Sequence, residues 1–369
     1  MELIELFKYM VSCKSQTPDD GGLLDFIEKY LPEFTALRVD VEDVKNLFLY
    51  KKFGEGDHLC FAGHVDVVPA GSAGWETNPY EAVEKEGYIY GRGTQDMKSG
   101  VAAFVQAAHE AQNFDGTLSI LLTSDEEGDA YYGTVEVLKY LEKENMLPDY
   151  AVVAEPTCEA AFGDAIKVGR RGSINGYITI QGKQGHAAYP EKGINPINLL
   201  APRLALMAGV DLDNGDAFFA PSKFVITDIR AGMEVTNVTP NELKMMFNVR
   251  NTTLTGQEEV AAFVAKHLDG LDYELKLTQG SYPFRTDTDT KVVKNIGKAI
   301  EVVTGIKTKH STAGGTSDAR FMAPLGIKVI EFGVRNDTIH SVNERTTRKE
   351  VEELYQVFQT LISRWSTND

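Results

Sequence analysis

Seven side chains that can bind metal ions follow apolar, strand-like runs of the sequence. They are His64, Asp66, Asp96, Glu126, Glu127, Glu155 and His340. Imidazole and carboxylate ligands without cysteine suit Zn²⁺, with Co²⁺ or Mn²⁺ as other occupants. Several carboxylates in one crevice would repel one another, and two divalent ions that share one carboxylate would offset this repulsion. The predicted chemistry is attack of an activated water on a carbonyl carbon.

Each of these residues also has a simpler interpretation when it is taken singly. His64 and Asp66 share one face of a strand, so their pairing can be structural. The acidic run 125–127 is typical of a solvated turn, and Asp96 can interact with the N-terminus of the helix that follows it. Because all of them occur together at successive strand ends, we favour the metal interpretation. One carboxylate must stay off the metals to transfer protons, and the adjacent Glu126 and Glu127 can divide these roles.

The elements that would position these side chains are strands alternating with helices. Up to about residue 165, apolar runs at 58–68, 117–127 and 150–157 alternate with helical patterns at 97–112 and 133–145. Continuous apolar runs separated by helices predict an α/β fold with a mostly parallel sheet covered by helices on both faces. The carboxyl ends of parallel strands share one edge of the sheet, where ligands bind.

After Arg171 the pattern changes to strand, helix, strand, strand, helix, strand, which is typical of a ferredoxin-like α+β unit. The α/β pattern returns from about Phe284. The sequence therefore predicts one catalytic domain, residues 1–171 and 285–369, interrupted by an inserted domain at 172–284.

Composition excludes several classes of function. Asp and Glu number 54 against 37 Lys and Arg, which gives a net charge of −17 and makes nucleic acid and anionic membranes poor partners. No apolar run reaches the ~18 residues of a membrane span. The first twelve residues lack a basic region and a cleavage site, and three scattered cysteines indicate a reduced protein, so we expect a cytoplasmic location. The GRG at 91–93 is no dinucleotide fingerprint, which disfavours a nucleotide site.

Eight strings together resemble a known enzyme family. They are GHVDVVP, YGRGTQDMKSG, TSDEEGDA, EPT, GRRGS, QGHAAYP, GGTSDARF and NDTIHSVNE. The sequence is similar to the di-zinc aminoacylase/carboxypeptidase family over nearly its whole length. GRRGS and the segment from GGTSDARF to RNDTIH are more specific, and resemble the branch that hydrolyses succinylated diaminopimelate in bacterial lysine and cell-wall biosynthesis.

The resemblance implies a role for each candidate residue. His64 and Glu155 would hold one Zn²⁺, Glu127 and His340 the other, which can also be Co²⁺, and Asp96 would bridge both. Glu126 would be the general base and acid, and Asp66 would orient His64. The inserted domain would form a homodimer and act as a lid, so that His186, which stabilises the oxyanion, and Asn237 reach the partner subunit's site.

The same resemblance implies the substrate, N-succinyl-LL-2,6-diaminopimelate, and the side chains that bind it. The substrate-binding positions would be Lys167, Arg170, Ser173, Tyr189, Asn237, Arg250, Gly315, Thr316, Arg320 and Asn336. Gln95 and the pair Tyr131–Tyr132 depart from the family pattern. We expect them to touch no ligand position and to affect pocket shape alone.

Three alternatives stay open. The nearest is another N-acyl amino acid hydrolase of the same family, such as an acetylornithine deacetylase, or a carboxypeptidase. The second is a non-catalytic metal-binding dimer with the same fold, which the unbroken ligand set disfavours. The third is a nucleotide-binding α/β protein, which the lack of a phosphate loop disfavours.

Overall fold

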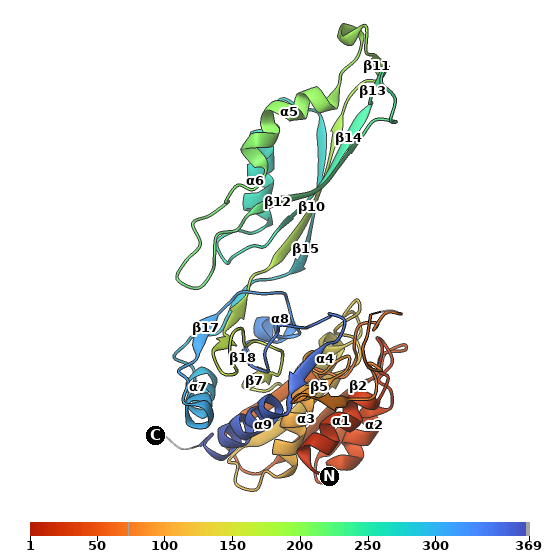
Figure 1. Cartoon of the computed structure of the whole chain (residues 1–369). Coiled ribbons are helices and arrows are strands. Elements are labelled where there is room, and N and C mark those ends of the chain that lie inside the picture. The colour runs from red at the N-terminus through yellow and green to blue at the C-terminus, as the bar shows by residue number, and fades with distance from the viewer. Residues whose placement is uncertain (73, 367–369) are drawn as a thin grey trace. The chain divides into compact units, whose positions relative to one another are not determined.

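A computed structural model describes residues 1–72 and 74–366, which divide into two compact units (Figure 1). Unit 1 comprises Met1–Gly169, Arg285–Ser311 and Ser317–Asp369. Unit 2 comprises Arg170–Phe284 and the short stretch Thr312–Thr316. The assignment of residues 172–284 to a separately folding domain stays a prediction.

Unit 1 is built on a sheet of eight strands. In spatial order they are β1 (Thr35–Arg38), β2 (Asn46–Lys52), β6 (Thr117–Thr123), β3 (His58–His64), β7 (Tyr150–Val153), β18 (Lys328–Glu331), β8 (Ala165–Lys167) and β17 (Lys309–Ser311). The neighbours β6, β3, β7 and β18 are parallel, whereas β1 and β2 form an antiparallel edge. The sheet is thus mixed and mostly parallel, which confirms the predicted α/β class.

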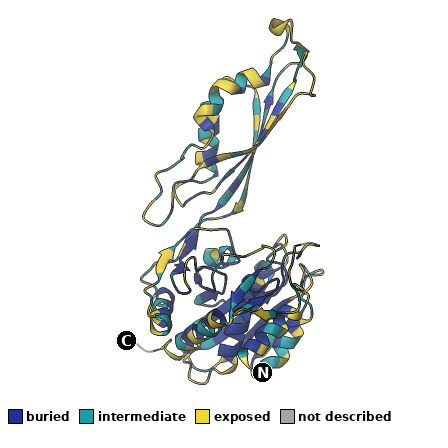
Figure 2. Ribbon diagram, viewed as in Figure 1, coloured by how far each residue is buried: buried dark blue, intermediate teal, exposed yellow. Residues whose placement is uncertain are grey.

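Seven α-helices of unit 1 accompany this sheet in the described residues. They are α1 (Leu3–Ser12), α2 (Leu23–Tyr30), α3 (Lys98–His109), α4 (Thr134–Lys143), α7 (Lys291–Thr304), α8 (Ala319–Met322) and α9 (Arg348–Ser363), followed after α8 by a 3-10 turn at Ala323–Leu325. The ring of Phe61 on β3 lies 5.8 Å from Phe104 on α3 and 5.0 Å from Phe358 on α9. These contacts help to bury the central strands such as β3 and β6, and buried residues are dark blue in Figure 2. Tight packing holds these strands in place, and with them their carboxyl ends, where ligands are expected.

A second, smaller sheet in unit 1 has three antiparallel strands, β4 (Val83–Lys85), β5 (Tyr88–Tyr90) and β19 (Arg345–Thr347). The parallel-sheet interpretation grouped the run before Asp96 with the other ligand-bearing strands. That run instead forms β5 of this separate sheet. Arg345 pairs with Tyr90, so the chain leaving β5 and the chain entering β19 lie side by side.

Unit 2 contains a four-stranded antiparallel sheet in the order β12 (Phe224–Ala231), β14 (Glu242–Val249), β10 (Ser173–Gln181), β15 (Tyr273–Ser281). The helices α5 (Pro196–Met207) and α6 (Gln257–His267) complete a βαββαβ order. The structure confirms the ferredoxin-like topology. Four two-residue strands lie outside this sheet. β11 (Gly185–His186) pairs with β13 (Val238–Thr239), and β9 (Gly169–Arg170) pairs with β16 (Phe284–Arg285), where the chain passes from one unit to the other. A 3-10 turn spans Pro190–Lys192.

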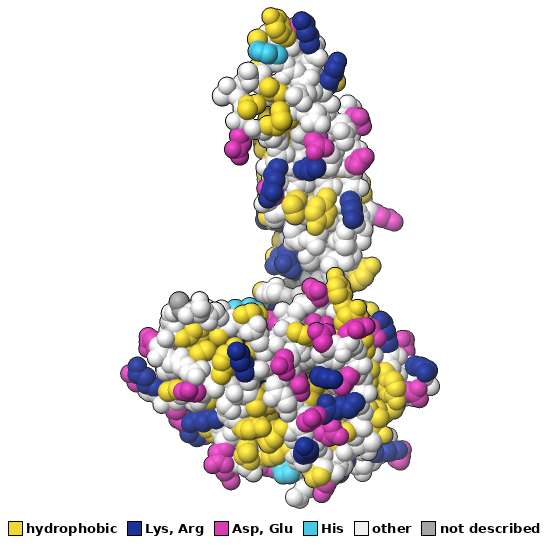
Figure 3. All heavy atoms as spheres, turned by 90° about the vertical axis from the view of Figure 1, so that its right-hand side faces the viewer, with side chains coloured by type: hydrophobic (Ala, Val, Ile, Leu, Met, Phe, Trp, Pro, Cys, Tyr) yellow, Lys and Arg dark blue, Asp and Glu magenta, His cyan; other side chains and the backbone are white. Residues whose placement is uncertain are grey.

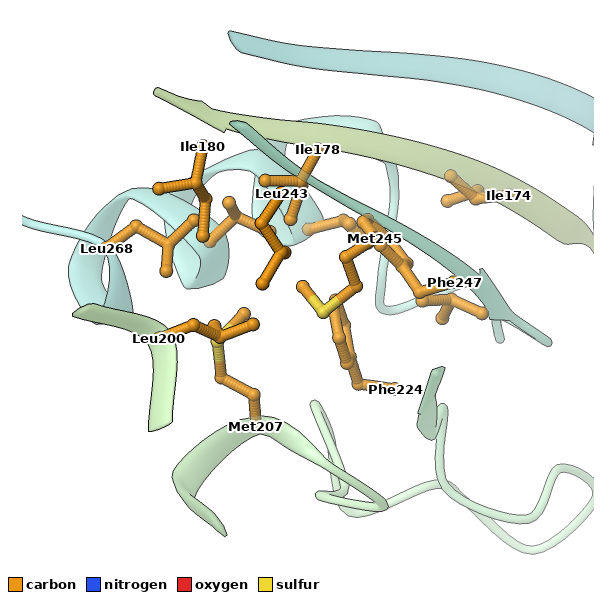
Figure 4. Close-up of a cluster of buried hydrophobic side chains, with 13 residues drawn as sticks. Ile174, Ile178, Ile180, Leu200, Met207, Phe224, Leu243, Met245, Phe247 and Leu268 are labelled. Carbon is orange, nitrogen blue, oxygen red and sulfur yellow. The ribbon is translucent and has the colours of Figure 1, made fainter. Parts of the chain in front are cut away.

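Alternate residues of the unit 2 strands form its core. Ile178 on β10 and Met245 on β14 point toward Leu200 and Met207 of α5 (Figure 4). This period-two burial is expected for a sheet with one covered face. Gly176 is required there, because a Cβ atom at this position would lie within 1.9 Å of the ring of Phe247.

Charged side chains are distributed over the surface of unit 1. Asp and Glu are interspersed with Lys and Arg on the face in Figure 3, and several form exposed pairs such as Lys8 with Glu84. The net charge of −17 therefore does not come from one site alone. Within the described residues, no helix is both long and apolar enough to cross a membrane.

Candidate active site

One half of the site is built around His64, the last residue of β3, which is 1 % exposed. Its Nδ1 lies 2.9 Å from the backbone carbonyl oxygen of Asp66. Its Nε2 lies 3.1 Å from Oδ1 of Asp96 and 3.7 Å from Oε1 of Glu155, which follows β7. A carbonyl acceptor at Nδ1 places the proton there and leaves the Nε2 lone pair for a metal ion.

The Asp66 carboxylate is fully buried beneath this half. It accepts hydrogen bonds from the Thr17 hydroxyl at 2.5 Å and from the Glu127 backbone N–H at 3.2 Å, and lies 3.6 Å from Nδ1 of His64. The prediction assigned the orientation of His64 to this carboxylate. In the structure the backbone carbonyl of Asp66 makes the hydrogen bond, and the carboxylate fixes the segment that carries the two glutamates.

The other half of the site is built around His340, which is half-exposed. Its Nε2 lies 2.8 Å from Oε1 of Glu127 and 3.4 Å from Oδ2 of Asp96. One oxygen of Asp96 therefore faces each histidine. Two groups with ligand atoms within 4.8 Å of one another result, and Asp96 belongs to both.

The chemistry of these donors fits two divalent cations. His64, Asp96 and Glu155 form one group, and Asp96, Glu127 and His340 form the other. Each supplies one imidazole nitrogen and two carboxylate oxygens, which are donor atoms that bind Zn²⁺, and three protein ligands are the usual number at a catalytic Zn²⁺ site. A carboxylate shared between two such groups is the arrangement expected for a pair of ions.

The protonation equilibria of the site reflect its crowded negative charge. Burial raises the pKa of Glu155 well above its usual value, and the neighbouring Asp96 raises it further. Burial alone would lower the pKa of His64, but the hydrogen bond with Asp96 and nearby carboxylates hold it well above its usual value. Hydrogen bonds with Asp96 and Glu127 raise the pKa of His340 to about 10. Protons thus neutralise these groups without metals, and two cations would take over that role.

Glu126 belongs to neither ligand group. Its Oε2 lies 4.0 Å from Nε2 of His64, and its backbone N–H donates to Asp66 at 3.4 Å. Burial raises the pKa of Glu126 well above its usual value, and Asp318 and other carboxylates raise it further. A buried carboxyl group beside a metal group, but outside it, suits proton transfer.

Three buried side chains that were not predicted as site residues support the site. Glu344 accepts hydrogen bonds from backbone N–H groups around Asp96, and Arg92 pairs with Glu344. Gln95 bonds to Asp337 and Thr338, in the segment that carries His340. The sequence had led us to expect an effect of Gln95 on pocket shape alone. In the sequence, these residues are marked only by their places in the motifs YGRGTQDMKSG and NDTIHSVNE. Their pairing could not be predicted, because the partners lie more than 240 positions apart.

Three predicted substrate-binding residues belong to unit 1. The Lys167 ammonium, on β8, is buried and lies 3.3 Å from both Glu159 and the Ser311 hydroxyl. The Nε of Arg320 is buried without a hydrogen-bond partner among the described residues. Asn336 is half-buried and bonds through its backbone N–H to Cys158.

The remaining predicted residues belong to unit 2, where they form two groups. In the first group, the Arg170 guanidinium donates to the carbonyl of Ala313 at 2.9 Å, which ties it to the stretch with Gly315 and Thr316. Ser173 begins β10, and the exposed Arg250 directly follows β14, whose last residue pairs with Ile174. These residues therefore lie at one end of the four-stranded sheet.

The second group lies beyond the opposite end of that sheet. His186 on β11 is exposed, and the backbone N–H of its neighbour Ala187 bonds to the carbonyl of Asn237 at 2.9 Å. The Tyr189 ring lies 5.8 Å from the His186 ring. The structure thus brings His186, Tyr189 and Asn237 together, but apart from Arg170, Ser173 and Arg250.

Comparison with known proteins decides the family. Peptidase family M20/M25/M40 matches residues 60–364, which include every proposed metal ligand. The chain belongs to this family. This confirms the predicted enzyme class, a hydrolase of amide bonds, and the resemblance of the sequence motifs.

Curated relatives of the chain in the family are similar over their full length. A succinyl-diaminopimelate desuccinylase from Sulfurimonas denitrificans is 76 % identical over 99 % of this chain and 100 % of its own. One from Nitratiruptor sp. is 66 % identical over 98 % of this chain and 99 % of its own.

Solved structures share the fold at low sequence identity. Aminopeptidase PepT from Bacillus cereus superposes with a TM-score of 0.81 at 20 % identity, covering 99 % of this chain and 98 % of its own. A dinuclear metal-binding peptidase of the family from Bacillus subtilis gives 0.73 at 15 % identity, covering 98 % and 96 %. These likenesses confirm the fold.

Proposed function

We propose that the chain is a zinc-dependent succinyl-diaminopimelate desuccinylase that acts as a cytoplasmic homodimer. It would hydrolyse N-succinyl-LL-2,6-diaminopimelate to succinate and LL-2,6-diaminopimelate. The observation that carries the hydrolytic part is the Asp96 carboxylate, which presents one oxygen to each histidine. The identity of the acyl group rests on relatives of the same name at 62–76 % identity.

The chain's own residues would move the protons of the reaction. A pair of bound Zn²⁺, with Co²⁺ possible in the second group, would supply an activated water and a Lewis acid for the amide carbonyl. Glu126 would accept a proton from the attacking water, because burial raises its pKa and so makes the carboxylate a stronger base, and would return it to the leaving amine. His186 would donate to the developing negative charge on the amide oxygen.

The homodimer is supported by the distribution of the predicted residues in unit 2. Ser173 and Arg250 lie at one end of the sheet, whereas His186 and Asn237 lie beyond the other. The nine residues of β10 are joined by eight steps of ~3.3 Å, which separates the two ends by about 26 Å. One chain therefore cannot apply both groups to one small substrate, but two chains can each supply one group.

The substrate would be held through its carboxylates. Arg170, Arg250 and Arg320 are guanidinium groups in a chain where acids exceed bases, and guanidinium binds carboxylate with two parallel hydrogen bonds. The unsatisfied Nε of Arg320 is a donor of this kind that is already buried. Lys167 is paired with Glu159, so we expect a substrate carboxylate to compete with that partner.

The test is turnover of succinyl-diaminopimelate beside acetylornithine by the same preparation, with zinc content measured. We expect the succinyl substrate to have the higher kcat/KM by at least one order of magnitude, because a site built for a charged group rejects an analogue that lacks it. Preference for acetylornithine would refute the acyl specificity but keep the hydrolase. No metal-dependent hydrolysis of either would instead support a non-catalytic metal-binding dimer.

A further inference from the structure

Arg92 and Glu344 form a buried ion pair in unit 1. Nη1 of Arg92 lies 2.7 Å from Oε2 of Glu344, and the two side chains are 4 % and 0 % exposed. Removing two charges from water costs more than their attraction returns unless further hydrogen bonds satisfy them. The other partners of both groups therefore indicate what the pair does.

Glu344 binds the backbone that leads to the shared ligand. Its Oε1 accepts from the N–H groups of Gln95 at 2.9 Å and Asp96 at 3.2 Å, and its Oε2 accepts from Gly93 at 3.1 Å. Three backbone donors on one carboxylate fix the path of residues 93–96. The direction of the Asp96 side chain follows from that path, since its Cα–Cβ bond is set by the backbone.

Arg92 binds the backbone that carries the opposite ligand. Its guanidinium donates to the carbonyl of Ser341 at 3.3 Å and to that of His340 at 3.4 Å. Gln95 adds a second link, because its amide nitrogen donates to Asp337 at 2.7 Å and its oxygen accepts from the Thr338 N–H at 2.8 Å. The segments of Asp96 and His340 are thus joined through buried side chains as well as through β5 and β19.

These links matter more for His340 than for His64. His64 ends a buried strand with hydrogen-bonded neighbours on both sides. His340 is 48 % exposed, lies outside regular structure and has a φ of 56°, so neither core packing nor a strand ladder orients it. Its position depends on whatever holds the backbone of residues 337–341.

We propose that Arg92, Glu344 and Gln95 are positioning residues that hold Asp96 and His340 at the separation needed by the metal ion of the His340 group. The inference rests on the proposed two-metal function. Partners that orient metal ligands commonly set affinity by about 10–100-fold. We expect an effect of this size on metal affinity from Arg92, Glu344 and Gln95, although none of the three touches the side chain of a metal ligand.

The test is a titration of the metal-free full-length protein with Co²⁺, followed by visible absorption and by competition with a chelating dye. In Glu344→Gln, the size is kept but an amide N–H₂ faces the Gly93 N–H and Arg92. We expect the step assigned to the His340 group to weaken about 10–100-fold and its absorption bands to change, while the first step changes less. Arg92→Met should act alike, and the double variant should lose little more than either single one.

The matched control is Asp213→Asn in unit 2, because the half-buried Asp213 carboxylate also accepts hydrogen bonds from backbone N–H groups, those of Gly215 and Ser222, and belongs to neither ligand group. It should lower the melting temperature without changing either Co²⁺ step. If Glu344→Gln does not fold, Gln95→Ala is titrated instead, with the same weakening expected in the His340 step. Unchanged affinity and spectra in a folded Glu344→Gln or Gln95→Ala protein would overturn the inference. A wild-type chain that binds fewer than two Co²⁺ would refute the two-metal proposal instead, and so the two failures are distinguishable.

Discussion

The two histidines of the site are held in different ways although they share one carboxylate. His64 belongs to the central sheet and is 1 % exposed, whereas His340 lies on a connection and is 48 % exposed. Hydrogen-bonded strand neighbours position the first. The side chain of Arg92, paired with Glu344, positions the second. The comparison teaches that the sheet explains half of this site, and a buried polar network explains the other half.

The difference suits a hydrolytic site. A buried ligand group would keep one bound cation dehydrated and strengthen electrostatic interactions around it. A half-exposed group would leave the other cation accessible to the substrate. Glu126 lies on the buried side, 4.0 Å from Nε2 of His64 and 13 % exposed, so the proposed proton-transfer group is largely shielded from bulk water.

The largest expected effects come from deleting each histidine. His64→Ala and His340→Ala should both reduce kcat/KM by at least about 10⁴-fold, because each removes several kcal/mol of charge stabilisation. They should differ in metal content. His340→Ala should keep one tightly bound ion. His64→Ala should weaken the binding of both ions, because His64 also contacts Asp96, the carboxylate that both ligand groups share.

Two other histidines serve as controls. His58 lies at the opposite end of β3 from His64 and bonds to the Ser119 hydroxyl at 2.8 Å, and His310 on β17 is exposed. His58→Ala should cost stability and His310→Ala should cost little, and both should keep two ions by elemental analysis. If His340→Ala lost both ions and His64→Ala lost one, the comparison between the halves would be reversed.

Glu126→Ala should have the next largest effect. We expect kcat to fall about 10²–10⁴-fold, the usual contribution of general acid–base catalysis, with the content of both metals unchanged. The measurement is steady-state turnover with zinc content on the same sample. Full activity would remove the assigned role, and loss of an ion would move Glu126 into one of the ligand groups.

Sequence reasoning reached the buried half of the site from physical principles. His64, Glu126 and Glu155 follow strands β3, β6 and β7, which are parallel neighbours, so their meeting at one edge follows from topology. Apolar and polar residues alternate along β10, and this alternation likewise allowed the unit 2 sheet to be predicted. These features depend on local periodicity, which a single sequence displays.

The exposed half could not be derived in the same way. Asp96 and His340 are positioned from β5 and β19, short strands 255 residues apart whose pairing no local pattern reveals. Glu344 reads as one more acid among 54, and only the fold shows that it is buried against Arg92. Asp96, Glu127 and His340 were candidates from residue type and position, but their grouping around one ion came from family resemblance.

Removal of metals by a chelator should distinguish the metal affinities of the two ligand groups without changing any residue. We expect the ion of the half-exposed group to leave first on dialysis against a weak chelator, because its ligands are accessible to solvent. Activity should then return on addition of about one equivalent of Zn²⁺ per chain. Simultaneous loss of both ions at every chelator concentration would show that the halves do not differ in affinity.

The smallest expected effect is the pH dependence of the metal-free protein. The pKa of His340 is about 10 in the folded chain against 6.5 for a free histidine, so the folded state binds more protons between these values. The stabilisation from His340 is therefore complete below pH 6.5 and is lost as pH rises toward 10. The raised pKa values of Glu126 and Glu155 act in the same direction from about pH 4.5 upward.

Bound metals replace these protons, so the gap in melting temperature between metal-loaded and metal-free protein should widen from pH 6 to pH 9. Because His340 is half-exposed, solvent screening keeps its share small, and metal-free His340→Ala should show a slightly shallower decline. A metal-free melting temperature that rises over this range would contradict the proton-filled site.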